Sequence, residues 1–190
     1  MTGQNPKPRV RRNTVSPSEY AAWRQGIQND WRVLAKAPYA MRVEVRLVLE
    51  AQRQNWRALQ YAPEELKSDT QFVLEAMQFG GLGLQFATEG PRGDREVVLA
   101  AVRKDGTAIR FAFYEAYRED PEIVWEAVRQ DWRALEFASK ELKQDKELCL
   151  FAVEQCWEAL QYVAEELHGD RDVMSVAVKQ SGEASAVLPC

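Results

Sequence analysis

The chain has 190 residues, 46% of them hydrophobic and 28% charged, which is enough to build a packed core beneath a solvated surface. Its net charge of -4 argues against a surface for sequence-specific nucleic-acid binding, which rests on many contacts between basic side chains and phosphates. No apolar run approaches the roughly 20 residues that cross a bilayer, and three cysteines do not make a disulfide framework.

A basic extension, residues 1–18, is predicted at the N-terminus, because this stretch has no acidic residue and four basic ones: Lys7, Arg9, Arg11 and Arg12. Its polar, proline-containing start does not fit a secretory signal. The composition suits a disordered tail, or an extended peptide that becomes ordered on an acidic surface of a protein, an RNA or a lipid bilayer. The four basic residues are therefore candidates for binding a partner.

Residues 19–190 repeat with a period of about 25. The similarity is clearest in the segments that start at four aspartates: DTQFVLEAM at Asp69, DREVVLAAV at Asp94, DPEIVWEAV at Asp120 and DKELCLFAV at Asp145. Seven copies can be aligned, with one extra residue in the copy that starts at Asp94; they start at Glu19, Glu44, Asp69, Asp94, Asp120, Asp145 and Asp170. A period of this length is typical of stacked structural units and not of a globular enzyme fold.

Each copy opens with a predicted helix of about 11 residues. An acidic residue occupies the N-cap, and apolar residues follow at the third, fourth, seventh and eighth positions, which is a helical stripe. The seventh position is always small, which predicts a close crossing with a neighbouring helix. The residues there are Gly26, Ala51, Ala76, Ala101, Ala127, Ala152 and Ala177.

A second helix start follows about eleven residues after the first, with N-caps predicted at Asp30, Asn55, Gly80, Asp105, Asp131, Cys156 and Ser181. The helix after it is predicted to have about 7 residues and to direct a leucine or isoleucine inward. The sequence thus predicts an all-α fold: an elongated, right- or left-wound α-solenoid of about seven 25-residue helix–turn–helix repeats. The irregular link at residues 88–93 is the candidate hinge between a front and a back half.

The segments Asp94 to Ala112 and Asp120 to Asp145 resemble the repeats of the family called domain of unknown function 4116. The resemblance covers roughly residues 40–182, with a decayed copy before it. It implies helical repeats and an interaction role. The family has no assigned catalytic residues, so the resemblance carries no site over to this chain.

The first residue after the second cap alternates between the largest side chain and none: Trp31, Trp56, Gly81, Gly106, Trp132, Trp157 and Gly182. A packed core does not tolerate such an exchange, so this position is predicted at the rim of the stack. Two interpretations stay open. The four tryptophans form aromatic steps for a partner, or each covers the turn and the link leucine of its own unit.

Nothing in the sequence predicts catalysis, a cofactor or a metal. His168 is the only histidine, and Cys149 occupies a core position of the repeat. Cys156 is expected at a partly exposed cap with no histidine nearby in sequence to activate it. The glycine-rich stretch 79–83 lacks the lysine and the preceding strand of a phosphate-binding loop.

The function predicted from the sequence is a non-catalytic interaction scaffold or accessory subunit. It would dock onto a larger, multi-subunit assembly of proteins through its repeat surface and its basic arm, at the periphery of a membrane complex or elsewhere. The alternative is a regulatory or effector module that binds one client peptide in a concave face. The cysteine content favours a reducing intracellular compartment, either the cytoplasm or, if a targeting segment has been removed, an organelle interior.

Overall fold

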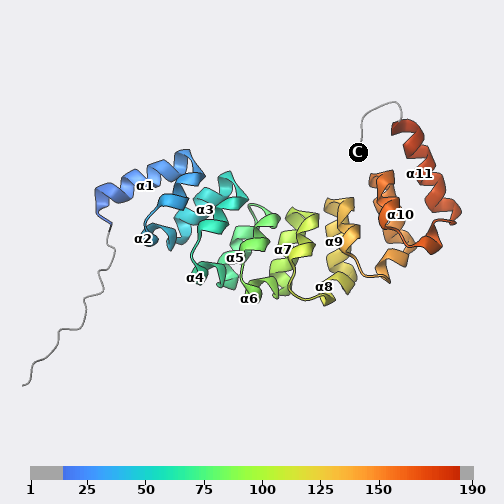
Figure 1. Cartoon of the computed structure of the whole chain (residues 1–190), viewed down its shortest axis with the longest axis horizontal. Helices are drawn as coiled ribbons and strands as arrows, with labels where there is room; N and C mark the ends of the chain where they lie inside the picture. Colours follow the sequence, from blue (N-terminus) through green and yellow to red (C-terminus); the bar gives the residue numbers. More distant parts are fainter. Residues whose placement is uncertain (1–14, 185–190) are drawn as a thin grey trace, which may run out of the picture.

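The computed structural model describes residues 15–184, and all regular structure within that range is helical. The elements stack side by side in chain order from α1 to α11 and form an elongated, curved array (Figure 1). The predicted all-α repeat fold is confirmed. The candidate residues Lys7, Arg9, Arg11 and Arg12 lie outside the described residues.

Seven longer helices form the first row of the array, one from each predicted repeat. They are α1 (Pro17–Asn29), α3 (Val45–Gln54), α5 (Thr70–Met77), α7 (Arg95–Lys104), α9 (Pro121–Gln130), α10 (Lys146–Gln155) and α11 (Arg171–Ala184). Consecutive members of this row pack on each other throughout.

Acidic N-caps start most of these helices, as the sequence predicts. The carboxylates of Asp69, Asp94, Asp120 and Asp145 each accept a hydrogen bond from backbone N–H groups of the first turn. The first repeat differs, because Ser16 caps α1 and forms a capping box with Glu19. Helix α1 therefore begins at Pro17, within the stretch predicted as the extension.

A second row contains the short helix of each of the first six repeats, which is a 3₁₀ helix of six residues. These helices are η1 (Trp31–Lys36), η2 (Trp56–Tyr61), η3 (Gly81–Phe86), η4 (Gly106–Phe111), η5 (Trp132–Phe137) and η7 (Trp157–Tyr162). The preceding cap residue is extended, with φ near -150° at Asp30, Asn55 and Asp131. The chain thus reverses sharply, and the short return segment adopts the tighter 3₁₀ form.

The links between repeats form a third row of short helices, which the helix–turn–helix prediction missed. They are α2 (Tyr39–Arg42), α4 (Glu64–Lys67), α6 (Glu89–Arg92), α8 (Ala116–Glu119), η6 (Leu142–Gln144) and η8 (Glu165–Leu167). Backbone hydrogen bonds join successive links: the N–H of Thr88 donates to the Lys67 carbonyl at 3.1 Å, and that of Ser139 to the Arg118 carbonyl at 2.9 Å. The candidate hinge at 88–93 contains α6 and belongs to this ladder; the hinge itself stays a prediction.

The core lies between the first two rows. The small residues at the crossing positions Ala51, Ala76, Ala101, Ala127 and Ala152 are completely buried. The inward residues of the 3₁₀ row are also completely buried at Leu34, Leu59, Leu84, Ile109 and Leu135. Each unit therefore covers the apolar stripe of its neighbour, which is how a repeat array makes one continuous core from units too small to fold alone.

The seventh repeat departs from the pattern. A turn and a second helix start are predicted at Ser181, and this prediction is wrong, because α11 continues to Ala184. The Ser181 hydroxyl donates to the Val178 carbonyl at 3.0 Å, so it bonds to its own helix instead of capping a new one.

Candidate partner-binding surface

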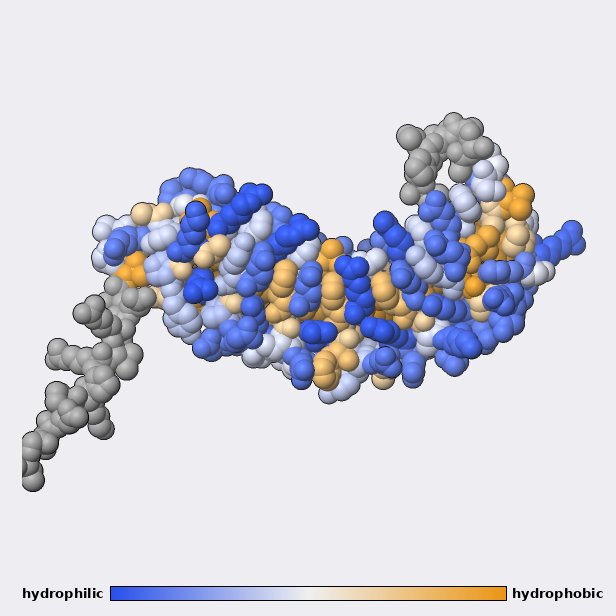
Figure 2. Space-filling view, in the orientation of Figure 1, coloured by the Kyte–Doolittle hydropathy of each residue, from blue (hydrophilic) through white to orange (hydrophobic). Residues whose placement is uncertain are grey.

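The four candidate tryptophans occupy the same place in four units, as the first residue of η1, η2, η5 and η7. Each long helix runs from a link to this turn, so the turns lie on the edge of the array opposite the links. The link helices α2, α4, α6 and α8 line one edge in Figure 1, and the opposite edge is hollowed near its middle (Figure 2). The tryptophans therefore lie beside the hollowed edge, in two pairs.

Three of the four rings stack on the next repeat. Trp31 stacks on Tyr61 with ring centroids 6.1 Å apart, and Trp56 stacks on Phe86 at 5.9 Å. Trp132 contacts Tyr162 of the next repeat at 6.1 Å with the two rings tilted. These indoles are half-buried, so each ring joins two units as well as facing solvent. These contacts join neighbouring units, and the choice between a partner-facing and a structural role for the tryptophans stays a prediction.

An arginine lies over each of these three rings. The guanidinium carbons of Arg32, Arg57 and Arg133 are 5.1, 4.5 and 5.7 Å from the centroids of the preceding tryptophans. At this distance a cation is attracted by the electron-rich face of the ring. The exposed side of the row is therefore a series of arginine–tryptophan pairs and not bare aromatic surface.

Trp157 is different. Its side chain is 36% exposed, and the following residue is Glu158, so no arginine stands at the equivalent position. The position in the next copy that would supply the stacking ring is Val187, which lies outside the described residues. Among the four candidates, Trp157 offers the most ring surface to a partner.

Glycine replaces tryptophan at this position in the two central repeats. A Cβ added to Gly81 would lie 2.0 Å from the carbonyl oxygen of Ala101, and one on Gly106 would lie 2.1 Å from that of Ala127. The backbone of η3 and η4 thus touches the last turn of the next long helix directly, which no other residue permits.

A glutamine from the next repeat accompanies three of the tryptophans. The Nε2 atom of Gln54 donates to the Ile27 carbonyl at 2.7 Å, and that of Gln155 donates to the Val128 carbonyl at 2.7 Å. Gln180 makes the same contact with Glu154. These amides satisfy carbonyl groups at the end of the preceding long helix, where helices lack internal partners.

Basic residues of the links have a structural role that sequence reasoning missed. Arg42 and Arg92 donate to the carbonyls of Tyr61 and Phe111 at the ends of 3₁₀ helices, the second at 2.7 Å. Lys143 donates to Glu136, and the His168 ring nitrogen contacts the Leu160 carbonyl at 3.2 Å. A basic residue at one fixed link position in every repeat is the signal that could have shown it. His168 is one of this series and not a lone ligand.

Two of the three cysteines, Cys149 and Cys156, lie in the part of the chain that the structure describes. Cys149 is completely buried, as predicted, and burial raises the pKa of its thiol to about 12, so it stays protonated at neutral pH. The expectation that Cys156 is partly exposed is wrong: it is completely buried, because a small apolar thiol can be buried at a turn where Asp30, Asn55 and Asp131 of other repeats remain half-buried.

Within residues 15–184 no group of three or more histidine, cysteine, aspartate or glutamate side chains could hold a metal ion. In the same range no helix is long and apolar enough to cross a membrane.

Comparison with known families gives one match. The profile of the family described as Domain of unknown function (DUF4116) matches three consecutive segments, residues 46–90, 94–143 and 145–187. Each segment spans about two structural repeats, because each contains two of the long helices: α3 and α5 in the first, α7 and α9 in the second, and α10 and α11 in the third. Searches of curated proteins and of solved structures find no match.

Proposed function

Since the chain belongs to the helical-repeat family Domain of unknown function (DUF4116), we propose that it is a non-catalytic interaction scaffold or accessory subunit. It docks onto a larger protein assembly through the row of arginine–tryptophan pairs and through its basic N-terminal arm. The contact begins at Trp157, the end of the row at which the ring has neither an arginine over it nor a described stacking partner.

The exposure of Trp157 is the observation that carries this proposal. Tryptophan and arginine are enriched among the few residues that carry most of the binding energy in protein interfaces. A row that alternates the two along one edge presents this chemistry repeatedly, at the spacing of the repeats. An elongated array supplies the length over which one partner can contact several units.

The test is native copurification of the full chain, followed by mass spectrometry. We expect a partner in fixed stoichiometry with the wild-type chain and a clear loss of that partner from Trp157→Ala. The matched control is Trp125→Ala, because Trp125 is half-buried on α9 against Phe151, away from the row. Recovery of the partner at wild-type levels by Trp157→Ala would remove the tryptophan row from the proposal.

The same experiment separates the alternative function. A module that binds one client peptide in its hollowed edge should be recovered alone, and it should bind short peptides in isolation. A scaffold or subunit should instead be recovered with a stable protein complex, and the arm should then resist proteolysis only in that complex.

A further inference from the structure

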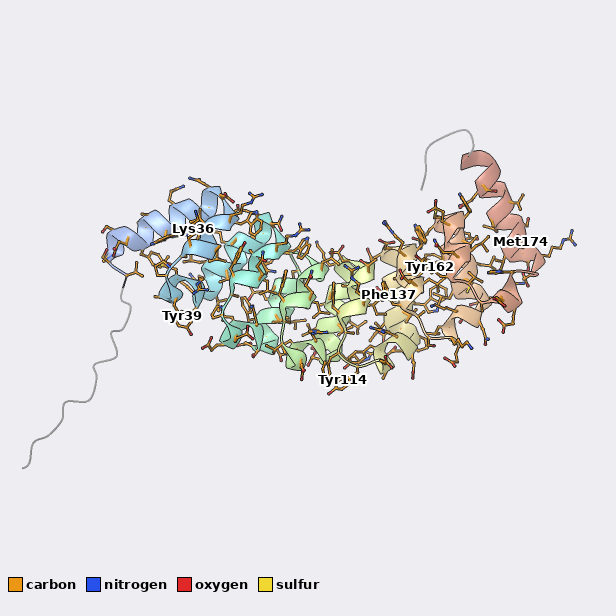
Figure 3. All side chains as sticks on the ribbon, in the orientation of Figure 1. Lys36, Tyr39, Tyr114, Phe137, Tyr162 and Met174 are labelled. Atoms are coloured by element: carbon orange, nitrogen blue, oxygen red, sulfur yellow. The ribbon has the colours of Figure 1, made fainter. Side chains whose placement is uncertain are left out.

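The link between the fourth and fifth repeats differs from the others in one respect. It contains the extra residue of the array, and it carries two neighbouring aromatic side chains that face solvent, Phe113 at 42% and Tyr114 at 53% exposure. Figure 3 shows Tyr114 at the outer edge of the array, and Figure 2 shows apolar atoms protruding there. This edge lies opposite the tryptophan row.

Contacts within the chain cover only part of the Phe113 and Tyr114 rings. Phe113 and Tyr114 meet edge to face with centroids 5.1 Å apart, and Tyr114 meets Tyr117 in the same way at 5.9 Å. Tyr114 also covers Gly93, where an added Cβ would lie 2.9 Å from its ring. The inner sides of the rings are thus held in place, while the outer sides remain in water as a rigid apolar surface.

Carboxylates follow this aromatic pair in the chain, at Glu115 and Glu119. A shallow groove of about 300 Å³ runs beside α8, with Phe137 and three exposed acidic side chains, Glu115, Glu119 and Glu136, in its lining. The one base in the lining, Arg118, is half-buried and donates to the Arg110 carbonyl at 3.3 Å. The groove therefore offers acidic side chains next to the aromatic pair. The equivalent groove one repeat later contains Lys140 and Lys143 against two glutamates, so it lacks this excess.

The chain itself contains a segment of complementary chemistry. Residues 6–12 read PKPRVRR, in which Val10 stands between Arg9 and Arg11. Two prolines favour an extended backbone, and an apolar residue flanked by cations matches an aromatic surface flanked by carboxylates.

The arm cannot reach this site within its own chain. Val10 is five residues from Val15, where the described structure starts, which spans at most about 18 Å when fully extended. The link at 113–119 follows α7, three helix spacings from α1, or at least about 24 Å at the usual separation of packed helices. The segment must come from a second copy.

We propose that the basic arm of one copy docks on the Phe113–Tyr114 surface of another. Val10 covers the two aromatic rings, and the flanking arginines pair with Glu115 and Glu119. The inference gives the arm of the proposed function a specific first partner. Its test needs only the purified chain. A negative result would therefore reject the contact between copies and leave the proposed role of the tryptophan row untested.

The experiment is sedimentation of the full chain over a range of concentrations at low salt. We expect reversible self-association that weakens as salt is added, because exposed ion pairs are screened. Reversal of the arm charges in Arg9→Glu, Arg11→Glu, Arg12→Glu should weaken association at least about tenfold, and so should Glu115→Lys, Glu119→Lys. One chain that carries both sets of reversals should associate again, because the charges are then complementary.

The aromatic part is tested by Phe113→Ser, Tyr114→Ser, which should also weaken association about tenfold by removing apolar contact area. The matched control is Tyr39→Ser, because Tyr39 is 46% exposed on the first link and has no role in the proposed contact. Circular dichroism before each run confirms that each variant is folded. A monomeric wild-type chain at all concentrations, or a combined reversal that fails to associate, overturns the proposal.

Discussion

In the third and fourth repeats the 3₁₀ helix begins at glycine, whereas in the first, second, fifth and sixth it begins at tryptophan. In the central repeats the backbone of the turn lies directly on the next long helix, at the Ala101 and Ala127 carbonyls. In the flanking repeats the contact passes through side chains: an indole on the next aromatic ring and, at most of these junctions, a glutamine amide on a backbone carbonyl. The same stacking arrangement is thus reached by backbone contact in one region and by large side chains in the other.

This difference bears on where the proposed partner contact lies along the hollowed edge. A glycine contact presents no side chain, so the middle of the hollowed edge offers little to a partner beyond its shape. The tryptophan pairs on either side expose ring surface that is shared between stacking and solvent. Any contact through this edge is therefore expected at the two ends of the array and not at its centre.

The largest effect is expected from closing the space at a central glycine. Gly106→Ala places a methyl group 2.1 Å from the Ala127 carbonyl oxygen, and because that oxygen belongs to the backbone, the two repeats must move apart. We expect a loss of about 3 kcal/mol in the free energy of unfolding, measured by urea denaturation.

The control for this substitution is Gly182→Ala. Gly182 lies in α11 with nothing near the position of an added Cβ, so alanine should leave stability unchanged or raise it by up to about 1 kcal/mol. If Gly106→Ala costs no more than this control, direct backbone contact does not distinguish the central repeats.

The next effect concerns the flanking repeats. Trp132→Ala removes a half-buried ring with its stacking contact to Tyr162 and its contact with Arg133, for an expected loss of about 2 kcal/mol. Trp157→Ala should cost less than about 1 kcal/mol, because this ring is exposed and has no arginine beside it. Urea denaturation of both variants beside the core truncation Leu135→Ala sets the scale. A loss at Trp132 equal to that at Leu135 would make the ring a core residue and withdraw it from partner binding.

Much of the fold is predictable from the sequence, because aligning the copies of the repeat shows which positions are equivalent. The aspartate caps, the small crossing residues and the buried leucines all follow from helical periodicity, which one chain displays seven times. The alternation of tryptophan and glycine predicted a rim for that position, which fits the half-buried tryptophans but not Gly81 and Gly106, since both are buried against the next long helix.

What the sequence could not supply were contacts between units. The stack of Trp56 on Phe86 joins residues 30 positions apart, and no local pattern links them. The burial of Cys156 likewise depends on the neighbouring unit, since cap residues are usually exposed. The 3₁₀ form of the second row and the helices in the links depend on the distance that the chain must span between packed helices. The spacing of apolar residues in the sequence does not specify that distance. The Phe113–Tyr114 surface is not predicted by the repeat, because its signal is one inserted residue that interrupts the 25-residue pattern.

A smaller effect tests the glutamine that accompanies tryptophan. Gln155→Ala removes the hydrogen bond to the Val128 carbonyl across the Trp132 turn, and the expected loss is about 1 kcal/mol by urea denaturation. Gln130 is exposed and occupies the equivalent position after Gly106, so Gln130→Ala should cost close to nothing. Equal losses in the free energy of unfolding at the two positions would show that the glutamine stabilises every repeat, and not only the repeats that carry tryptophan.

The smallest effect asks whether the two regions differ in the row of long helices as well. The first residue of α7, Arg95, pairs with Asp120 at 3.0 Å and Glu122 at 2.6 Å in the central region. The first residue of α10, Lys146, pairs with Asp170 at 2.9 Å and Asp172 at 2.6 Å in the flanking region. Because these pairs are exposed, Arg95→Ala and Lys146→Ala should each lower Tm by no more than about 2 °C, and by less in high salt.

The Lys146 pair also has a pH signature with a definite sign. The hydrogen bond from Lys146 lowers the pKa of Asp170 below its ordinary value, so this contribution is present above the ordinary aspartate pKa of about 4 and is lost as pH falls through the lowered value. Thermal melts from pH 7 downward should therefore show a smaller decrease in Tm with falling pH for Lys146→Ala than for the wild type.

Similar small Tm losses at Arg95 and Lys146 would confine the regional difference to the 3₁₀ row, because the long helices would then be joined alike in both regions. A clearly larger loss at one of them would extend the difference to the whole repeat, and glycine and tryptophan would no longer be its sole origin.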